Sequence, residues 1–512
     1  MRILSPAKAL TLSLILIFGI SACAPAPVNL PSTAIPNPTA TRFPTTVPTV
    51  TPTPLPEGYV RYISQSGDTL PAVAVHFGVE TTQIMGAKNL PRTAILDPGS
   101  ELLVPDILEQ TTPGEILFPD SAVVYSTYAI GFDIQEFADE QNGFLAAYTE
   151  LMVRGTTLAS EVISQLALEH SINPKILLAL MEAESGWVRT TPEEDNAIWY
   201  PFGYIRKDRS GIYQQTGWAI QQLTRGYYGW RDGTLTELTF ADGETLRLAG
   251  NLNAGTVAVL YFFAQSHNRA EWENLVYSDD GIRAIYQDLF KDPAHADTAG
   301  WEALFPVGIT QPQLELPLPP NQVWNLTSGP HSAWGRYGAR AALDFAPPTD
   351  RAGCGNSIHW TTAAAPGRVV RVGNGVVVLD LDQDGYEQTG WVLVYMHVAN
   401  ADRVEKDTYL ETDDRIGHPS CEGGSSSGVH VHIARKYNGE WVLADGGLPF
   451  TMSGFVAAAE EPVCDYAWWG WCRGTLDNGQ LTVTADPFGN AGTRIFRPDS
   501  DEDFLLRLTP TP

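Results

Sequence analysis

Two histidines separated by a single residue, His430 and His432, are the feature that most constrains how the C-terminal part of this chain folds. They lie in residues 428–435, where apolar side chains alternate with other residues, as in a β-strand with one buried face. Because side chains alternate between the two faces of a strand, both imidazoles are expected on the same face. Two adjacent imidazoles suit a site in which one binds a metal ion and the other transfers a proton.

Further metal-ligating side chains stand upstream of this pair. His331 and Asp344 precede it, and His397 ends an apolar run over residues 391–397. Six of the ten histidines fall between His331 and His432, which favours a shared metal site over separate structural histidines. Zinc held by three protein ligands keeps a fourth position for water and lowers the pKa of that water to about 7. A neighbouring imidazole can then accept the proton of the water as it attacks a peptide carbonyl.

These residues, in this order, resemble the zinc endopeptidases of the lysostaphin and β-lytic class, which cut the peptide cross-links of bacterial cell walls. The resemblance covers residues 316–462 and is nearer to the β-lytic branch, where the Asp is far from the first His and stands in a Leu-Asp-Phe context. The lysostaphin branch would place its Asp where this chain has Arg340. The resemblance implies one zinc ion per chain with three ligands, His331, Asp344 and His432. It implies two catalytic histidines, His430 and His397.

The region around these residues is expected to be mainly antiparallel β structure. Short β-rich runs, separated by Gly and Asp turns, occupy residues 368–372, 376–381, 391–398 and 428–435. The stretch from Asp380 to Gly385 resembles part of a calcium loop, so Ca²⁺ is an alternative ligand there. The flanking strands favour a plain hairpin tip instead. Two further histidines without such partners, His359 and His418, are interpreted as structural.

The N-terminal residues are typical of an exported protein. In residues 1–23, two basic residues precede an apolar stretch and two small residues. Ile20-Ser21-Ala22-Cys23 resembles the processing box of a bacterial lipoprotein, which implies lipidation at Cys23; an ordinary cleaved signal is the alternative. Residues 24–56 are rich in Pro, Thr and Ala and predict an extended linker that buries no core. We therefore expect a protein held at the bacterial cell surface by a lipid anchor.

Residues 57–106 resemble a LysM module, a β-α-α-β fold that binds glycans containing N-acetylglucosamine. The resemblance rests on Gly67-Asp-Thr-Leu70, the apolar run 73–79, Asn89-Leu90 and Leu102-Leu-Val-Pro105. Local signals agree: Asp68 or Thr69 can cap the first helix, Gly78 can end it, and Thr81 or Thr82 can cap the second. By position, the sugar groove would be formed by Gly67, Asp68, Thr69, Leu70, Ile95 and Leu96. The alternative is that these residues only build turns and caps.

Residues 110–300 are predicted to be largely helical. One helix is marked by Asn173 as N-cap, Pro174 in the first turn and Gly186 as the stop. Just before that stop, Glu184-Ser185-Gly186-Trp187 resembles the catalytic Glu-Ser segment of lysozyme-like lytic transglycosylases. The negative end of a helix raises the pKa of a carboxyl group, as a general acid on a glycosidic bond requires. The alternative is that Glu184 is a solvated helix-end residue in a fold kept for binding.

Four cysteines remain besides Cys23, and export favours disulfides among them, with three connectivities open. We expect Cys464–Cys472 and Cys354–Cys421. The first pair would close a small tryptophan-rich loop, and the second would brace the strand that leads to His430. Residues 463–512 comprise this loop, a hairpin around Asp477-Asn-Gly479 and an acidic tail.

The formal net charge of −27 argues against nucleic-acid binding, which needs a basic face, and against polybasic attachment to a membrane. The sequence therefore predicts a multidomain surface lipoprotein with a LysM module, a mainly helical domain and a mainly antiparallel β peptidase domain. Its expected partner is peptidoglycan, whose peptides it cuts with zinc. Two alternatives stay open: a non-catalytic wall adaptor that activates other hydrolases, and a lytic transglycosylase that acts through the helical domain.

Overall fold

The computed structural model describes residues 55–499, except 87–89, 92, 154, 292–302, 337, 349–352, 356, 462–463 and 465–470. Residues from 55 onward belong to one compact unit. Within the described residues, no helix is both long enough and apolar enough to cross a lipid bilayer. The export signal, Cys23, most of the linker and the acidic tail beyond residue 499 lie outside the described residues.

The module at residues 57–106 contains an antiparallel strand pair and one α-helix. Strands β1 (Tyr59–Ile63) and β2 (Glu101–Pro105) pair along their whole length, and helix α1 (Leu70–Phe77) follows β1. Thr69 caps α1 by accepting a hydrogen bond from the backbone N–H of Ala72, and Gly78 ends it with φ 69°. Both of these signals were predicted from the sequence.

The prediction of a second α-helix in the module is wrong for the residues that the structure describes. The described residues between α1 and β2 contain one 3₁₀ turn, η1 (Thr81–Gln83), and its N-cap is Glu80 instead of Thr81 or Thr82. The backbone N–H and C=O of Met85 both bond to Leu103 of β2, at 2.9 and 3.1 Å. Because Met85 is already committed to this strand-like pairing, the turn cannot extend into a longer helix.

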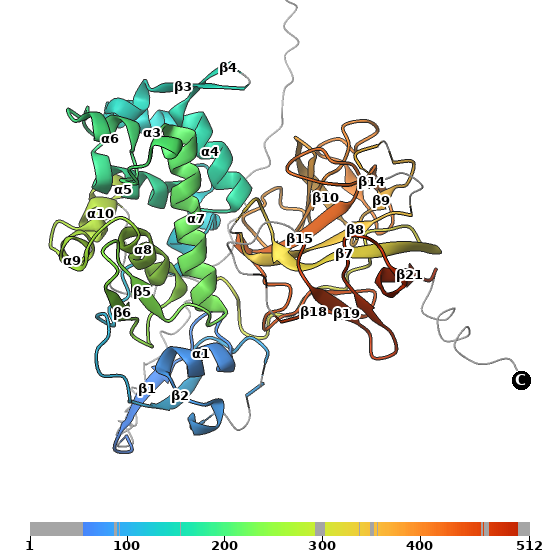
Figure 1. Ribbon diagram of the computed structural model, residues 1–512, viewed down its shortest axis with the longest axis horizontal. Helices are drawn as coiled ribbons and strands as arrows, with labels where there is room; N and C mark the ends of the chain where they lie inside the picture. The colour runs from blue at the N-terminus through green and yellow to red at the C-terminus, as the bar shows by residue number, and fades with distance from the viewer. Residues whose placement is uncertain are drawn as a thin grey trace, which may run out of the picture. The chain divides into compact units, whose positions relative to one another are not determined.

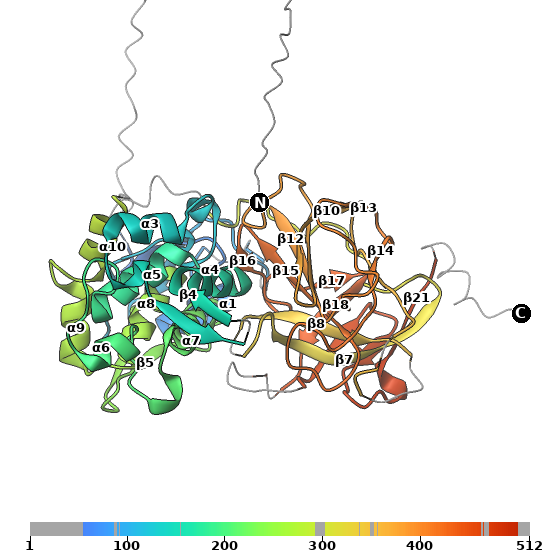
Figure 2. The same ribbon diagram turned by 90° about the horizontal axis from the view of Figure 1, so that it is seen from above.

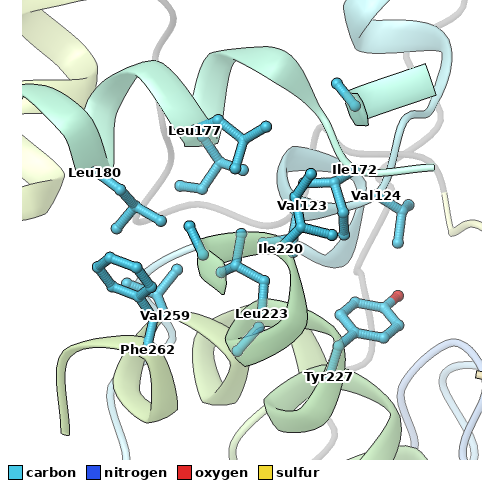
Figure 3. Packing of buried hydrophobic residues seen from close by; sticks show 14 of the residues in the cluster. Val123, Val124, Ile172, Leu177, Leu180, Ile220, Leu223, Tyr227, Val259 and Phe262 are labelled. Carbon is cyan, nitrogen blue, oxygen red and sulfur yellow. The ribbon is translucent and has the colours of Figure 1, made fainter. Parts of the chain in front are cut away.

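The helical domain packs around helix α7, which Figure 1 shows in green. Its helices are α2 (Asp120–Val123), α3 (Ile134–Gln141), α4 (Ala159–His170), α5 (Pro174–Ser185), α6 (Asp195–Trp199), α7 (Ile212–Arg231), α8 (Ala254–Ala264), α9 (Arg269–Tyr277) and α10 (Ile282–Phe290), with 3₁₀ turns η3 (Thr127–Ala129), η4 (Phe144–Ala146) and η5 (Lys207–Arg209). Two short hairpins accompany them, β3 (Thr149–Met152) with β4 (Gly155–Leu158) and β5 (Glu237–Thr239) with β6 (Thr245–Arg247). Figure 3 shows how Leu177 and Leu180 of α5 face Ile220 and Leu223 of α7 across the core.

Helix α5 begins and ends where the sequence indicates. The side chain of Asn173 accepts a hydrogen bond from the backbone N–H of Lys175, and Pro174 occupies the first turn. Gly186 ends the helix in the left-handed conformation with φ 67°. This end of α5 carries Glu184.

The C-terminal domain is built on a nine-stranded antiparallel sheet, with β7, β8 and β15 labelled in Figures 1 and 2. The strands run in the order β13-β10-β11-β12-β15-β8-β7-β21, and β16 pairs with β15. Their bounds are β7 (Gln322–Ser332), β8 (Arg340–Ala346), β10 (Gly367–Gly373), β11 (Val376–Asp380), β12 (Trp391–Met396), β13 (Tyr409–Leu410), β15 (Val431–Tyr437), β16 (Glu440–Trp441) and β21 (Arg494–Arg497). The remaining elements are β9 (Thr361–Thr362), β14 (Arg415–Gly417), β17 (Thr451–Met452), β18 (Phe455–Ala459), β19 (Gly474–Asp477), β20 (Thr482–Thr484) and η7 (Ala491–Thr493).

Candidate metal centre

Strand pairing brings the predicted ligands His432 and Asp344 together. In the antiparallel pair of β15 and β8, His432 lies directly opposite Asp344. Directly opposite residues of an antiparallel pair have Cβ atoms about 4.5–5.5 Å apart, so their side chains meet on one face of the sheet. On the other side of β15, His432 lies opposite Met396, the last residue of β12, and His397 follows it.

The expected strand position of His430 needs a correction. Strand β15 begins at Val431, and His430 precedes it in an isolated bridge with Ser420. The backbone carbonyl of Gly428 accepts a hydrogen bond from His430 Nδ1 at 2.8 Å, which orients the imidazole. The imidazole nevertheless reaches the same place as predicted, because His430 Nε2 lies 3.5 Å from Asp344 Oδ2.

His331 reaches the site through irregular pairing between β7 and β8. The register shifts between Leu326 and Ser328, between Ser328 and His331, and again just after His331. Such bulges re-aim a side chain without ending the strand. The result is that His331 Nε2 lies 3.2 Å from Asp344 Oδ1, although its paired residue in β8 is Ala342.

The three predicted ligand atoms form a nearly equilateral triangle. His331 Nε2 lies 3.1 Å from His432 Nδ1 and 3.2 Å from Asp344 Oδ1, and His432 Nδ1 lies 3.1 Å from the same oxygen. Zinc bonds of about 2.0–2.1 Å in tetrahedral geometry separate neighbouring ligands by roughly 3.3 Å. The triangle therefore has the dimensions of one face of a zinc tetrahedron. Among the described residues, two groups of acidic or histidine side chains are placed to hold a metal ion, and this triangle is one of them.

Backbone carbonyls fix which nitrogen of each imidazole carries the proton. Gly329 O lies 2.9 Å from His331 Nδ1, and Ala333 O lies 3.0 Å from His432 Nε2. A carbonyl oxygen can only accept, so each of these nitrogens donates its N–H. The other nitrogens, His331 Nε2 and His432 Nδ1, then face each other with lone pairs beside a carboxylate. Such a cluster of electron pairs fits a bound cation, and this outer hydrogen bonding is typical of metal-ligating histidines.

The two predicted catalytic histidines stand side by side next to this triangle. The ring centroids of His397 and His430 are 4.4 Å apart. His397 Nδ1 donates to Glu422 O at 2.8 Å, and His430 Nδ1 donates to Gly428 O at 2.8 Å. Both residues therefore present Nε2 as an acceptor. His397 also has φ 62°, in the left-handed region that few non-glycine residues adopt and in which His is one of the enriched types.

The surroundings of Asp344 and His397 lower the pKa values of both side chains. Burial favours the neutral carboxyl of Asp344, but the attraction of His331 and His430, which acts when these imidazoles carry a second proton in the metal-free site, holds its pKa well below the ordinary value. Burial, helped by the charges of His430 and His432, lowers the pKa of His397 to about 3. At neutral pH the site therefore contains an ionised carboxylate beside a neutral His397.

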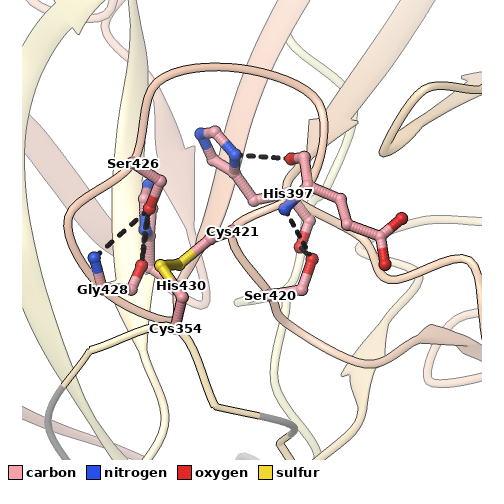
Figure 4. Close-up of a disulfide and its surroundings, with 8 residues drawn as sticks. Cys354, His397, Ser420, Cys421, Ser426, Gly428 and His430 are labelled. Atoms are coloured by element: carbon pink, nitrogen blue, oxygen red, sulfur yellow. Dashed lines mark hydrogen bonds between the residues drawn. A yellow bond between two sulfur atoms is a disulfide. The ribbon is translucent and has the colours of Figure 1, made fainter.

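A cavity of about 790 Å³ opens over these side chains. Trp334, the serine- and glycine-rich residues 423–428 and Trp471 line its walls. Both expected disulfides, Cys354–Cys421 and Cys464–Cys472, are confirmed. Figure 4 shows the first of them at the base of the loop that carries Ser426 and Gly428 towards His430. Because Glu422 follows Cys421 directly, this bridge also holds the carbonyl that orients His397.

The carboxylates Asp380, Asp382 and Asp384 form the second group placed to hold a cation. They begin residues 381–390, which connect β11 to its antiparallel neighbour β12, so the hairpin expected here is confirmed, with a long connection at its tip. The backbone N–H groups of Asp382 and Gly385 donate to Asp380 at 3.2 and 2.9 Å. These donors stabilise Asp380 without an ion, and Ca²⁺ at this position stays an unfavoured prediction.

The two histidines predicted to be structural, His359 and His418, lie apart from the triangle. His418 Nδ1 donates a hydrogen bond to His359 O at 2.7 Å.

In the helical domain, Glu184 is buried and not solvated. Its side chain is only 4% exposed, and its carboxylate lies 2.9 Å from His267 Nε2. Burial raises the pKa of Glu184, while the hydrogen bond and the charge of His267 oppose that rise. His267 follows α8 and is 83 residues away in the sequence, where no motif indicates it. A Cβ at Gly203 would overlap the Glu184 carboxylate, so that backbone closes over the pair.

The six residues predicted for the sugar groove divide into two groups. Asp68, Leu70 and Leu96 are buried inside the module, where Asp68 accepts hydrogen bonds from the hydroxyl of Tyr62 and the backbone of Gln65. Gly67, Thr69 and Ile95 instead line a cavity of about 260 Å³ together with residues of the helical and β domains. Only this second group is placed to meet a ligand.

Comparison with known proteins finds similarity to a protein family and to a curated protease. The family described as the N-terminal domain of LasA matches residues 116–302. Protease LasA from two strains of Pseudomonas aeruginosa, UCBPP-PA14 and PAO1, is 28% identical over 345 residues, covering 64% of this chain and 75% of the relative. This similarity supports a peptidase.

Two solved structures are among those that the structural comparison finds similar to parts of this chain. The M23 metalloprotease pseudoalterin from the deep sea is 18% identical, with a TM-score of 0.27, and covers 34% of this chain and 96% of its own. The catalytic domain of lysostaphin from Staphylococcus simulans is 20% identical, with a TM-score of 0.17, and covers 23% of this chain and 85% of its own.

Proposed function

We propose that this protein is a zinc-dependent endopeptidase that hydrolyses the peptide cross-links of peptidoglycan. The observation that carries the proposal is the triangle of His331 Nε2, Asp344 Oδ1 and His432 Nδ1, whose edges of 3.1–3.2 Å suit one zinc ion. Zinc bound there would polarise the scissile carbonyl and lower the pKa of a water molecule to about 7. The similarity to Protease LasA supports the peptidase part of this proposal.

The surrounding side chains supply the proton transfers. His430 Nε2 carries a lone pair and lies 3.5 Å from Asp344 Oδ2, so it accepts the proton of the attacking water and passes it to the leaving amine. His397 stays neutral and presents its Nε2 as a second acceptor that orients the same water. Asp344 stays ionised, which keeps it available as a ligand.

The test is a product analysis on purified peptidoglycan digested by the full-length protein, with and without a chelator. Cleavage of cross-links releases new primary amines and splits cross-linked muropeptides, which mass spectrometry resolves. We expect these products to disappear with the chelator and to return when zinc is restored. If the peptidoglycan stays uncut without the chelator and the purified protein holds no metal, the non-catalytic adaptor is favoured instead.

We propose that the N-terminal residues attach the protein to the cell surface and to the wall glycan. Cys23 would become the lipid-modified N-terminus, and Gly67, Thr69 and Ile95 would contact glycan strands. Cys23→Ser should move the protein from the membrane fraction to the soluble exported fraction, measured by fractionation and by mass spectrometry of the N-terminus. A lipid-free mature protein in the unmodified strain would contradict the anchor.

A second candidate function, glycan cleavage by the helical domain, is favoured by the buried Glu184. Its raised pKa and its hydrogen bond to His267 are properties of a general acid. If the domain is active, Glu184→Gln should abolish anhydro-sugar release while the peptide cleavage at the zinc site persists. The comparison needs three proteins: the unmodified chain, Glu184→Gln and His430→Ala. Anhydro-sugar release that is equal in all three would contradict a catalytic Glu184.

A further inference from the structure

The three residues of the module that are placed to meet a ligand line a cavity, and the C-terminal β domain forms the opposite wall of that cavity. Gly67, Thr69 and Ile95 line one side of this 260 Å³ cavity, and the β domain contributes the opposite side from the segment that follows β16. We call residues 443–448 the docking loop, because they bring this segment against the module. The face predicted to bind sugar is therefore not open to solvent along its whole length.

Gly447 is the point at which the docking loop touches the module. Its carbonyl oxygen accepts a hydrogen bond from the backbone N–H of Ile95 at 3.3 Å. A Cβ at Gly447 would lie 2.6 Å from Thr69 Cγ2, 2.9 Å from Ile95 N and 3.0 Å from Thr93 O. Only a residue without a side chain can approach this closely, so the backbone amide of Gly447 fills the space between Thr69 and Ile95.

The helical domain covers the Gly67 end of the same face. A Cβ at Gly67 would lie 2.6 Å from Arg231 Cζ, and Arg231 donates a hydrogen bond to the carbonyl of Ser66. The guanidinium is held in place by two buried carboxylates, Asp120 at 2.7 Å and Glu440 at 2.8 Å. Arg231 therefore links the module, the helical domain and the β domain at one point.

The docking loop is stiffly attached to the sheet that carries the metal ligands. Arg435 of β15 donates hydrogen bonds to the carbonyls of Leu443 and Leu448, at both ends of the loop. Arg340 of β8 forms an ion pair with Asp445 at 3.1 Å. Because the sheet holds the loop at these points, the module is the part that must move if another ligand takes its face.

We propose that the docking loop occupies the glycan-binding face of the module, so that glycan binding and docking of the module exclude each other. The chemistry of the contact supports the match. The backbone unit at Gly447 is a secondary amide, as is the acetamido group of N-acetylglucosamine, and its carbonyl occupies the N–H of Ile95, which is then not available to a bound sugar. The inference rests on the proposed glycan binding by the module. In this arrangement, wall glycan releases the module from the β domain.

The test measures binding of the N-acetylglucosamine pentamer to the full-length protein by titration calorimetry. Gly447→Glu places a side chain where a Cβ already overlaps Thr69, so the module should be displaced without any change in its own residues. Gly355→Glu adds the same charge at a position where a Cβ meets nothing within 4 Å, and it serves as the matched control. We expect Gly447→Glu to bind the pentamer at least about tenfold more tightly than the unmodified protein and the control, because docking lowers the fraction of binding-competent module.

Hydrogen exchange at the Ile95 amide separates the ways in which the inference can fail. Exchange should become faster in Gly447→Glu, because the hydrogen bond to Gly447 is lost. Equal affinity in all three proteins would overturn the competition between loop and glycan. Unchanged exchange in Gly447→Glu would show that the loop does not cover this face. Faster exchange with no pentamer binding by any protein would overturn glycan binding by the module, and with it this inference, while leaving the proposed peptidase untouched.

Discussion

His430→Ala is expected to keep its zinc and to lose about 10²–10⁴-fold in turnover, whereas His432→Ala is expected to lose both. The difference follows from the geometry. His432 Nδ1 is a corner of the ligand triangle, while His430 presents Nε2 to Asp344 at 3.5 Å from outside it. Zinc per chain, measured by mass spectrometry of the metal, and amine release from peptidoglycan are the two readouts.

A third histidine in the same domain provides the control for this pair. His418 donates to His359 O and belongs to neither the triangle nor the catalytic pair. His418→Ala should therefore retain metal and turnover near those of the unmodified protein. The assignment of roles would be wrong if His430→Ala lost its zinc, or if His432→Ala kept both zinc and full activity.

Arg231→Met is expected to lower the free energy of unfolding by about 3–5 kcal/mol, the largest effect on stability that we foresee. The side chains of Arg231, Asp120 and Glu440 are 6%, 9% and 3% exposed, so the substitution leaves two buried carboxylates without their cation. Uncompensated buried charge is far more costly than the loss of an exposed ion pair. Urea unfolding followed by tryptophan fluorescence measures the change.

Arg283 offers a control with the same chemistry and a different environment. Arg283 and Glu115 form an ion pair of 2.7 Å, but their side chains are 25% and 54% exposed. Arg283→Met should therefore cost less than about 1 kcal/mol. Equal losses in the two variants would show that burial of the Arg231 network does not contribute the expected stability.

The sequence was sufficient to predict in outline that these side chains gather, because two of the histidines are spaced as on one face of a strand. The spacing of His430 and His432 indicates a shared face, and the structure brings both imidazoles to Asp344. The irregular register of β7 that re-aims His331 had no comparable signal, because a bulge depends on how two strands pair. The carbonyl of Ala333, which orients His432, is equally invisible in a sequence, since every residue has one.

Local signals predicted helix ends better than they predicted long-range partners. Asn173 and Gly186 bound α5 as expected, because capping depends on a few adjacent residues. The pairing of Glu184 with His267 depends on how α5 and α8 pack, and nothing near either residue indicates it. The described residues of the module form a short turn where a second helix was predicted for the same reason, since the pairing of Met85 with a strand distant in the sequence ends the turn.

The most direct test of the central claim is a zinc titration of the metal-free protein, with amine release from purified peptidoglycan as the readout. The triangle of His331, Asp344 and His432 provides for one ion. Activity should rise from background in proportion to added zinc and reach its plateau at one zinc per chain, and His432→Ala should stay at background throughout. Full activity in the metal-free protein, or the same titration curve for His432→Ala, would contradict a zinc peptidase at this site.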